Sequence, residues 1–390
     1  MKSSNNHKAT LLNSRLLDNF TQAIMNNSND PAVPVPIFDC DFIQAAHLRV
    51  VQMHASAAHP VEAPTLLELE QALGEPVTKC ELWTQNWRNR LYRIELASGH
   101  TALAKQAVMG TEAMVQYQYD QLGVLARLDI PGLRVPRALA FLRAKRIYVM
   151  EFARGKTIES LVWNRTARDD LVRACELAGK ILAQMHVVRT EKICPMPVEA
   201  LTHDLAAAPW HLSSRQRRIL HSALKNLARA ELRMGEIYFD YKPANLLFEK
   251  DELFLVDLPG TVRQEAHLRD FVTFQSSMRR YLWRLSWRRP FDQRGAGIRE
   301  AMAVFQDAYL ANVGTPYPEC ELFAATVRLF ELQRTAVLMT MQKGKVTAIR
   351  KKMPIAGNGH LGDSLTNRIT LLLLDLEKRW LFRQLARELP

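Results

Sequence analysis

The sequence predicts an α+β protein with two lobes: a small five-stranded lobe with one main helix, followed by a larger helical lobe. Residues 77–152 contain short runs rich in Val, Ile, Phe and Tyr, which are the residue types that favour strands. Residues 156–388 show mainly helical periodicity. The length of 390 residues is sufficient for two lobes, each with its own core.

The small lobe is expected at residues 76–153. Its strands are expected at 77–83, 90–96, 101–108, 134–142 and 146–152, and its helix at 111–128. Turn-forming pairs set two of the boundaries, namely Ser98-Gly99 and Pro131-Gly132. The larger lobe is expected at residues 154–390. Its helices are expected at 156–164, 168–188, 214–233, 267–288, 296–312, 319–342 and 365–388, and two short strands at 246–248 and 253–257.

Residues 1–75 are expected to be a partly flexible extension, because their first half is rich in Asn and Ser and ends in a proline-rich run at 31–36. This extension carries four basic and eight acidic residues, whereas the whole chain has a net charge of +12. The remaining residues are therefore strongly basic. A basic body suits an anionic partner such as a nucleotide, a phosphorylated glycan, a nucleic acid or a membrane surface.

The five cysteines lie far apart and form no Cys-x-x-Cys pair. This spacing argues against a zinc site or a disulfide framework and suits a reducing compartment. The first residues do not resemble a secretory signal, and no run approaches the roughly 18–20 apolar residues that span a bilayer. We therefore expect a cytoplasmic protein whose only membrane contact would be peripheral, at the inner face.

The segment from Tyr238 to Asp257 holds the residues with the clearest chemical signature. Asp240 lies at a loop bend, Asn245 follows five residues later, and Asp257 ends an apolar strand. The two short strands flank a tight turn, so they should pair and bring Asn245 close to Asp257. Phosphoryl transfer needs a carboxylate that orients the attacking hydroxyl, and oxygen ligands that hold Mg²⁺ against the phosphates. Asp240 suits the first role, and Asn245 and Asp257 suit the second.

This segment resembles the protein-kinase-like superfamily, whose catalytic loop has the pattern Asp-x-x-x-x-Asn followed by a metal-binding Asp. The resemblance implies that Asp240 is the catalytic base and that Lys242 approaches the transferred phosphate. It also implies ATP and Mg²⁺ as cofactors, with Asn245 and Asp257 as metal ligands. The fold implied is bilobal, in agreement with the order of the expected strands and helices.

The resemblance extends to the small lobe. The lysine of the family's third strand contacts the α- and β-phosphates and pairs with a carboxylate on the next helix, and Lys105 occupies this position. For its partner we favour Asp120 over Glu112, which lies only seven residues beyond Lys105. Glu151, at the end of the last strand of this lobe, is also predicted to be a nucleotide-binding residue.

Three departures from the family pattern leave an alternative open. No glycine-rich loop joins the first two strands, so the phosphates would be covered by backbone amides or by the side chains of Asn86, Arg88, Asn89 or Arg90. Tyr238 replaces the usual histidine of the catalytic loop, and Asp-Leu-Pro-Gly at 257–260 replaces Asp-Phe-Gly. A pseudokinase that binds a nucleotide and acts as a scaffold is therefore the alternative from another functional class.

More than 50 residues separate His186, which we interpret as structural, from Asp240. Such an insertion is similar to aminoglycoside and choline-type phosphotransferases and to lipopolysaccharide core-sugar kinases. In the latter, an Arg-Asp helix resembles residues 267–280, and Asp270 would anchor the catalytic loop. The resemblance implies transfer of the γ-phosphate of ATP to a hydroxyl, with a sugar of a lipopolysaccharide-type glycolipid as the leading acceptor. A soluble metabolite or a protein is the alternative acceptor.

The helix expected at 267–288 ends in a run of arginines and aromatic residues. Arg280, Arg284 and Arg288 are spaced to share one helical face. We favour a solvated helix whose tryptophans enter the core, and the alternative is a surface for an anionic lipid or glycolipid. Nucleic acid is disfavoured because no nucleic-acid-binding module accompanies the run.

Overall fold

The computed structural model describes residues 62–85, 89–108, 110–196, 198–238, 240–288, 292–317, 322–350 and 361–389. Residues 1–61 of the extension expected at 1–75 lie outside these ranges, and the described remainder of it contains a helix at Leu66–Leu73. The chain divides into two compact units, which we call the catalytic unit (Val50–Lys192 with Arg233–Pro318) and the helical unit (chiefly Ile193–Leu232 with Glu319–Pro390). Each of them is therefore built from segments that are not contiguous in the sequence. The predicted boundaries at residues 75 and 153 stay predictions.

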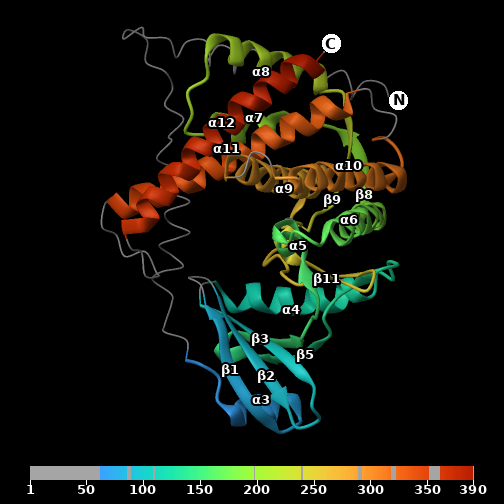
Figure 1. Ribbon diagram of the computed structural model, residues 1–390, viewed down its shortest axis with the longest axis vertical. Helices are drawn as coiled ribbons and strands as arrows, with labels where there is room; N and C mark the ends of the chain where they lie inside the picture. Colours follow the sequence, from blue (N-terminus) through green and yellow to red (C-terminus); the bar gives the residue numbers. More distant parts are fainter. Residues whose placement is uncertain are drawn as a thin grey trace, which may run out of the picture. The chain divides into compact units, whose positions relative to one another are not determined.

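The small lobe of the catalytic unit is an antiparallel sheet with the strand order β1-β2-β3-β6-β5, with α3 and α4 on opposite sides (Figure 1). This arrangement confirms the predicted α+β fold with a five-stranded lobe. Its elements are α3 (Leu66–Leu73), β1 (Val77–Gln85), β2 (Asn89–Leu96), β3 (Thr101–Ala107), α4 (Glu112–Ala126), β5 (Ala138–Leu142), η1 (Arg143–Lys145) and β6 (Ile147–Glu151).

The two faces of this sheet differ because side chains alternate along a strand. One face packs against Leu69 of α3 and forms an apolar core with Tyr92, Ile94, Ala104 and Val149. Lys105 follows Ala104 in β3, so it lies on the other face. The lysine is thereby kept away from the apolar core that stabilises the lobe.

The single strand predicted at 134–142 is two strands in the structure. β4 (Leu133–Arg134) pairs in parallel with β11, whereas β5 belongs to the five-stranded sheet. Pro136 lies between them, and a proline cannot donate to a strand ladder. The chain therefore changes sheets at this point.

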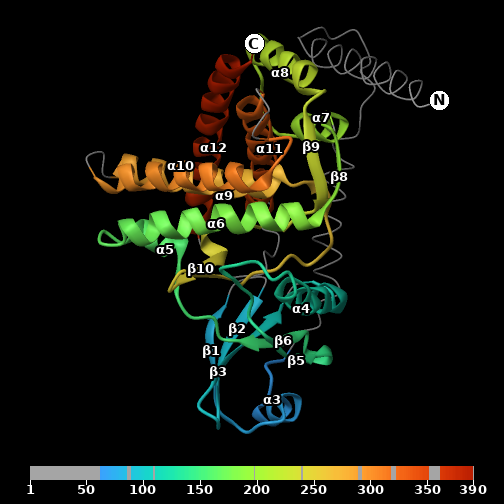
Figure 2. The same ribbon diagram turned by 90° about the vertical axis from the view of Figure 1, so that its right-hand side faces the viewer.

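The larger part of the catalytic unit is mainly helical, and α6 and α10 run side by side in it (Figure 2). A side chain at Gly179 of α6 would meet the carbonyl oxygen of Phe305 in α10, since a Cβ there would lie only 2.4 Å away. Glycine therefore permits the close approach of the two helices. The elements are β7 (Lys156–Thr157), α5 (Ile158–Trp163), α6 (Arg168–Arg189), η2 (Pro243–Asn245), β10 (Leu246–Glu249), β11 (Glu252–Leu255), β12 (Gln264–Ala266), α9 (Leu268–Arg288) and α10 (Arg294–Val313).

The helical unit contains α7 (Val198–Ala206), α8 (Ser214–Leu227), α11 (Phe323–Arg350) and α12 (Leu361–Glu388), and α11 packs along α12. Two strands carry the chain between the units, β8 (Thr190–Pro195) and β9 (Glu231–Glu236). Within the described residues, no helix combines the length and the apolar character needed to cross a membrane.

The helix predicted at 214–233 was too long. α8 ends at Leu227, and β9 follows from Glu231. Residues 229–234 include Ala, Glu, Leu, Arg and Met, which all favour helix, but Met234, Gly235 and Glu236 pair with β12. Tertiary pairing thus overrides local propensity. The consequence for the site is that a strand leads directly into the catalytic loop.

Candidate active site

The catalytic loop runs from the end of β9 to η2 and is anchored at two points. The backbone N–H of Tyr238 donates to Asp270 Oδ2 at 2.6 Å, and Asp270 is fully buried at the start of α9. The hydroxyl of Tyr241 donates to the carbonyl oxygen of Ala178 in α6 at 2.8 Å. Asp240 lies between these anchors, so its position is fixed from both sides.

Asp240 contacts both of the other predicted loop residues. Lys242 Nζ lies 2.6 Å from Asp240 Oδ2, and Asn245 Nδ2 donates to the same oxygen at 3.1 Å and to the Asp240 backbone carbonyl at 3.0 Å. The Asp240 side chain remains 35% exposed, so a hydroxyl can approach it. The loop therefore presents a carboxylate that is held in place and still accessible.

The β10–β11 hairpin brings the two predicted metal ligands into neighbouring positions. Leu246 pairs with Leu255, and the backbone N–H of Val256 donates to the carbonyl oxygen of Asn245 at 3.2 Å. Asp257 follows directly after Val256. The amide nitrogen of Asn245 is engaged with Asp240, which directs its amide oxygen, a suitable metal ligand, away from that carboxylate.

Lys105 and Asp257 form an ion pair although 152 residues separate them in the sequence. Lys105 Nζ lies 2.5 Å from Asp257 Oδ1, and the lysine is 7% exposed while the aspartate is 41% exposed. Burial alone would lower the pKa of Lys105, but Tyr148 and Asp257 outweigh it and raise the pKa above its ordinary value. The lysine is therefore a fixed positive charge next to the predicted metal ligand.

Tyr238 joins the catalytic loop to the strand that carries Asp257. Its hydroxyl donates to the backbone carbonyl of Asp257 at 2.5 Å. Burial, together with the nearby Asp257 and Asp240, holds the pKa of Tyr238 well above its ordinary value, so the hydroxyl stays protonated. The tyrosine that departs from the family's histidine thus donates to the backbone of Asp257, a predicted metal ligand.

The structure does not bring Asp120 to Lys105, and this corrects the predicted pair. Asp120 is exposed and accepts a hydrogen bond from Gln116 at 2.9 Å. Gln118 faces the site instead, because its Nε2 donates to the Leu258 carbonyl at 2.7 Å. Asp120 is two positions after Gln118, and residues two positions apart point about 200° apart around a helix axis. Asp120 therefore faces the opposite side of the helix. Glu112 is also engaged elsewhere, with Arg143 at 2.8 Å.

Within the catalytic unit, α4 is fixed to β9 and to the segment after Asp257 by residues that the sequence analysis did not single out. The hydroxyl of Tyr117 donates to Glu236 Oε1 at 2.6 Å, and Arg189 Nη2 lies 2.7 Å from the second oxygen of Glu236. Together with Gln118, these contacts tie the helix to β9 and to the segment after Asp257. Nothing in the spacing of these residues could have revealed the contacts of Tyr117 and Gln118, which span 119 and 140 positions.

Glu151 lies at the end of β6, where its contacts are with Arg137. It is exposed, its backbone N–H donates to the Arg137 carbonyl at 2.9 Å, and Arg137 N–H donates to its Oε2 at 3.4 Å. The carboxylate therefore terminates the β5–β6 pairing. Nucleotide binding by Glu151 stays a prediction.

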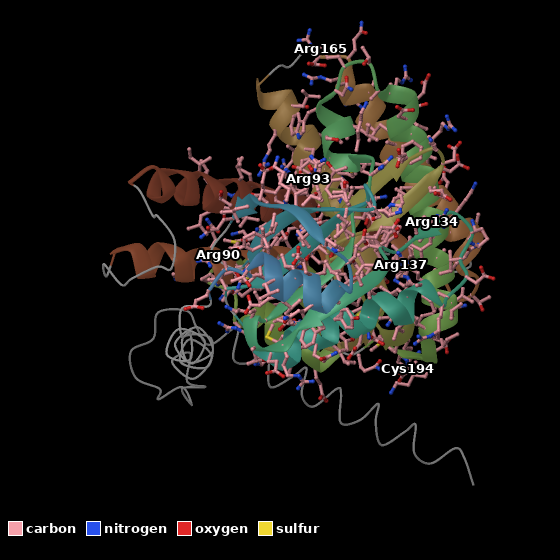
Figure 3. The ribbon with its side chains drawn as sticks, turned by 90° about the horizontal axis from the view of Figure 1, so that it is seen from below. Arg90, Arg93, Arg134, Arg137, Arg165 and Cys194 are labelled. Carbon is pink, nitrogen blue, oxygen red and sulfur yellow. The ribbon has the colours of Figure 1, made fainter. Side chains whose placement is uncertain are left out.

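The residues proposed for phosphate cover are only partly described. Asn86 and Arg88 lie outside the described residues, whereas Asn89 and Arg90 begin β2. Arg90, labelled in Figure 3 together with Arg93 of the same strand, pairs in register with Gln85 and Gln106. Phosphate cover by these residues stays a prediction.

Only part of the arginine face at the end of α9 is described, and that part is not uniformly exposed. Arg284 is exposed, but Arg280 is half-buried, and the side chain of Arg288 lies outside the described residues. Tyr281 is buried and packs against Trp163, with 5.9 Å between ring centroids. The helix is thus largely a core element, because its apolar and aromatic side chains pack inside the catalytic unit.

His186 belongs to a buried cluster behind the catalytic loop. Its Nδ1 lies 2.9 Å from the Tyr309 hydroxyl, its ring stacks on His267 at 4.5 Å, and its Nε2 lies 3.6 Å from Asp270 Oδ2. Burial lowers the pKa of His186 to about 3, and that of His267 to about 2. Both imidazoles are neutral at ordinary pH and lie behind the anchor of the loop.

The donor set fits a hard divalent cation. Asn245 offers an amide oxygen and Asp257 a carboxylate, and Mg²⁺ typically takes one or two carboxylates and completes its shell with phosphates and water. Among the described residues, no cluster of three or more His, Cys, Asp or Glu could hold a metal.

The solved structures that share this fold include two phosphotransferase-like proteins. The macrolide 2′-phosphotransferase MphH from Brachybacterium faecium is 15% identical, covers 77% of this chain and 95% of its own, and has a TM-score of 0.50. A Ralstonia eutropha protein, provisionally assigned as an aminoglycoside phosphotransferase, is 11% identical, covers 87% of this chain and 98% of its own, and has a TM-score of 0.53. At these identities the likeness concerns the fold.

No curated protein sequence matches the chain. The family model described as the phosphotransferase enzyme family matches residues 79–304, which include the five-stranded sheet, the catalytic loop and the β10–β11 hairpin. This match covers more than half of the chain. The protein is therefore a member of the phosphotransferase enzyme family, with a protein-kinase-like fold.

Proposed function

We propose that the protein transfers the γ-phosphate of ATP to a hydroxyl group of a sugar, with a lipopolysaccharide-type glycolipid as the leading acceptor. The observation that carries the proposal is the ion pair between Lys105 and Asp257 at 2.5 Å, which joins the small lobe to the loop segment beside Asp240. The pair brings together a lysine and a carboxylate of the kinds that contact the phosphates and the metal in kinases, and this supports the proposal.

In this mechanism, Asp240 accepts the proton of the acceptor hydroxyl while its oxygen forms a bond to the γ-phosphorus. The bond between the γ-phosphorus and the β,γ-bridging oxygen breaks, and ADP leaves. Lys105 binds the α- and β-phosphates, and Lys242 is placed to neutralise charge on the transferred group. Asn245 and Asp257 would hold Mg²⁺, which neutralises charge on the phosphates when it is bound.

One observation supports an acceptor that bears negative charge, and a second supports a sugar of a lipopolysaccharide-type glycolipid. The chain carries a net charge of +12, which favours anionic ligands. Asp270 anchors the catalytic loop through Tyr238 N–H, as the resemblance to lipopolysaccharide core-sugar kinases implies. The largely buried α9 offers no support for a membrane-facing role of its arginines, so the proposal rests on the acceptor's charge and not on a membrane contact.

The test has two stages. Thermal stability is first measured with and without Mg²⁺-ATP, and ADP formation is then measured against a core oligosaccharide, a neutral amino sugar and a generic protein substrate, with Asp240→Asn as control. We expect stabilisation by Mg²⁺-ATP and Asp240-dependent turnover that is fastest with the core oligosaccharide. Turnover with the protein substrate alone would favour a protein kinase. Stabilisation by the nucleotide without turnover on any acceptor would favour the pseudokinase.

A further inference from the structure

Lys105 lacks the carboxylate partner that a helix of the small lobe would be expected to supply. Glu112 pairs with Arg143, and Asp120 faces away from the site. The ion partner of Lys105 is Asp257, which is also the predicted metal ligand. A carboxylate that binds a metal has less charge to offer a lysine, so Lys105 needs a second neighbour when the nucleotide and Mg²⁺ are bound.

Tyr148 occupies the position of such a neighbour. It lies directly opposite Lys105 in the antiparallel β3–β6 pair, and its ring centroid is 5.8 Å from Lys105 Nζ. Opposed side chains on the same face of a sheet are in reach of each other. Both belong to a sheet whose register fixes their separation, so the position of Tyr148 does not depend on the nucleotide.

The hydroxyl of Tyr148 is buried without a partner. Tyr148 is 1% exposed, and its hydroxyl has no hydrogen-bond partner among the described residues. A buried polar group without a partner costs free energy, so such groups are uncommon and call for a reason. Burial raises the pKa of Tyr148 despite the opposing charge of Lys105, so the hydroxyl is a neutral dipole.

We propose that the Tyr148 hydroxyl is a positioning group that holds the Lys105 ammonium toward the nucleotide phosphates, in place of a helix carboxylate. This inference rests on the proposed function, because it presumes that Lys105 binds phosphates. The two groups are close enough for each to shift the pKa of the other, and Lys105 keeps one neighbour when Asp257 engages a metal. A neutral partner leaves the full positive charge of the lysine available to the phosphates.

The test compares Tyr148→Phe with Tyr92→Phe in the full chain. Both substitutions remove one buried hydroxyl from the same sheet, but Tyr92 lies on the other face and donates to Gln106 at 3.1 Å. The dissociation constants of ADP and adenosine are measured for each variant. We expect Tyr148→Phe to weaken ADP binding about tenfold, as for loss of a contact to a charged group, and to leave adenosine within twofold. Tyr92→Phe should leave the ratio of the two constants unchanged.

A double-mutant cycle with Lys105→Met assigns the effect to the lysine. If Tyr148 acts through Lys105, Tyr148→Phe changes the ADP constant by less than twofold in the Lys105→Met background. The inference is overturned if Tyr148→Phe leaves the ratio of the ADP and adenosine dissociation constants unchanged. It is also overturned if Tyr148→Phe changes the ADP constant equally with and without Lys105. Unfolding of Tyr148→Phe would overturn it too, because the hydroxyl would then be structural. A parent protein that binds ADP no better than adenosine would instead overturn the proposed function.

Discussion

The Tyr238 hydroxyl donates to the backbone carbonyl of Asp257 across 2.5 Å, so one buried side chain links the catalytic loop to a predicted metal ligand. We expect Tyr238→Phe to weaken the apparent affinity for Mg²⁺ about tenfold, because the Asp257 carbonyl loses its partner and the segment loses its anchor. The measurement is the Mg²⁺ dependence of turnover. Tyr241→Phe is the control, since its hydroxyl bonds Ala178 and no predicted metal ligand. Equal Mg²⁺ dependence in both variants would contradict this role.

Asp257→Asn should weaken Mg²⁺-ATP binding, because an amide replaces the only anionic oxygen donor that we assign to the metal. It should also release Lys105 from its ion pair. The measurement is calorimetric titration with ATP in the presence and absence of Mg²⁺. Glu252→Gln lies on the same hairpin and removes only an exposed pair with Arg134, so it should bind like the parent. A folded Asp257→Asn variant with unchanged Mg²⁺-dependent affinity would remove Asp257 from the metal site.

Asp240→Asn should leave ATP binding nearly intact and lower turnover by about 10²–10⁴-fold, the usual contribution of a positioned base. Single-turnover rates and nucleotide affinity separate the two effects. A suitable control is Asp251→Asn, because Asp251 lies at an exposed turn with a positive φ of 65°, which asparagine tolerates. Turnover of Asp240→Asn within a factor of two of the parent would exclude the residue as the base.

The carboxylates of α4 should matter little to catalysis. Asp120→Asn and Glu112→Gln should each keep turnover and the KM for ATP within about twofold of the parent, because exposed pairs contribute little. Lys105→Met should raise the KM for ATP strongly, since it removes the buried charge itself. Steady-state kinetics at varied ATP concentrations make the comparison. A loss in Asp120→Asn as large as that in Lys105→Met would restore the helix carboxylate as the partner of the lysine.

Stability should fall as the pH is lowered below about 6.5, because His186 and His267 are buried with pKa values lowered to about 3 and about 2. In this window the unfolded chain binds protons at these histidines and the folded chain does not, so unfolding is favoured at lower pH. Each histidine contributes a slope of up to about 1.4 kcal/mol per pH unit.

The free energy of unfolding, measured from pH 7 to pH 5, checks this dependence. His186→Gln should give a shallower slope than the parent, whereas His100→Gln, at an exposed turn, should not change it. Identical slopes in all three proteins would show that the buried histidines do not govern the acid response.

The sequence predicted those parts of the site that depend on short-range geometry. Asp240 and Asn245 share one loop, and a tight hairpin brings Asn245 to Asp257, so their spacing was sufficient. The prediction for Asp120 was wrong because the side of a helix that faces its neighbours depends on contacts such as that of Gln118 with Leu258.

The pairing of strands could not be predicted from the sequence for a related reason. Residues 231–236 include residues of helical propensity, and strand pairing, such as that with β12, makes them a strand. Tyr148 lies 43 positions from Lys105, and its proximity depends on the register of β3 with β6. Sequence periodicity predicts which faces are apolar, but it does not determine which residues of distant strands lie opposite each other.

The close packing of α6 against α10 has a consequence for the folding of the chain during its synthesis. Gly179 lies against the carbonyl of Phe305, and Phe274 of α9 stacks on the Phe305 ring at 4.0 Å. Lys105, Asp240, Asn245 and Asp257 leave the ribosome before Phe305 does, and domains complete their packing as units during synthesis. A nascent chain halted before α10 would thus carry every proposed catalytic residue and still lack the support that holds α9 and its Asp270 in place.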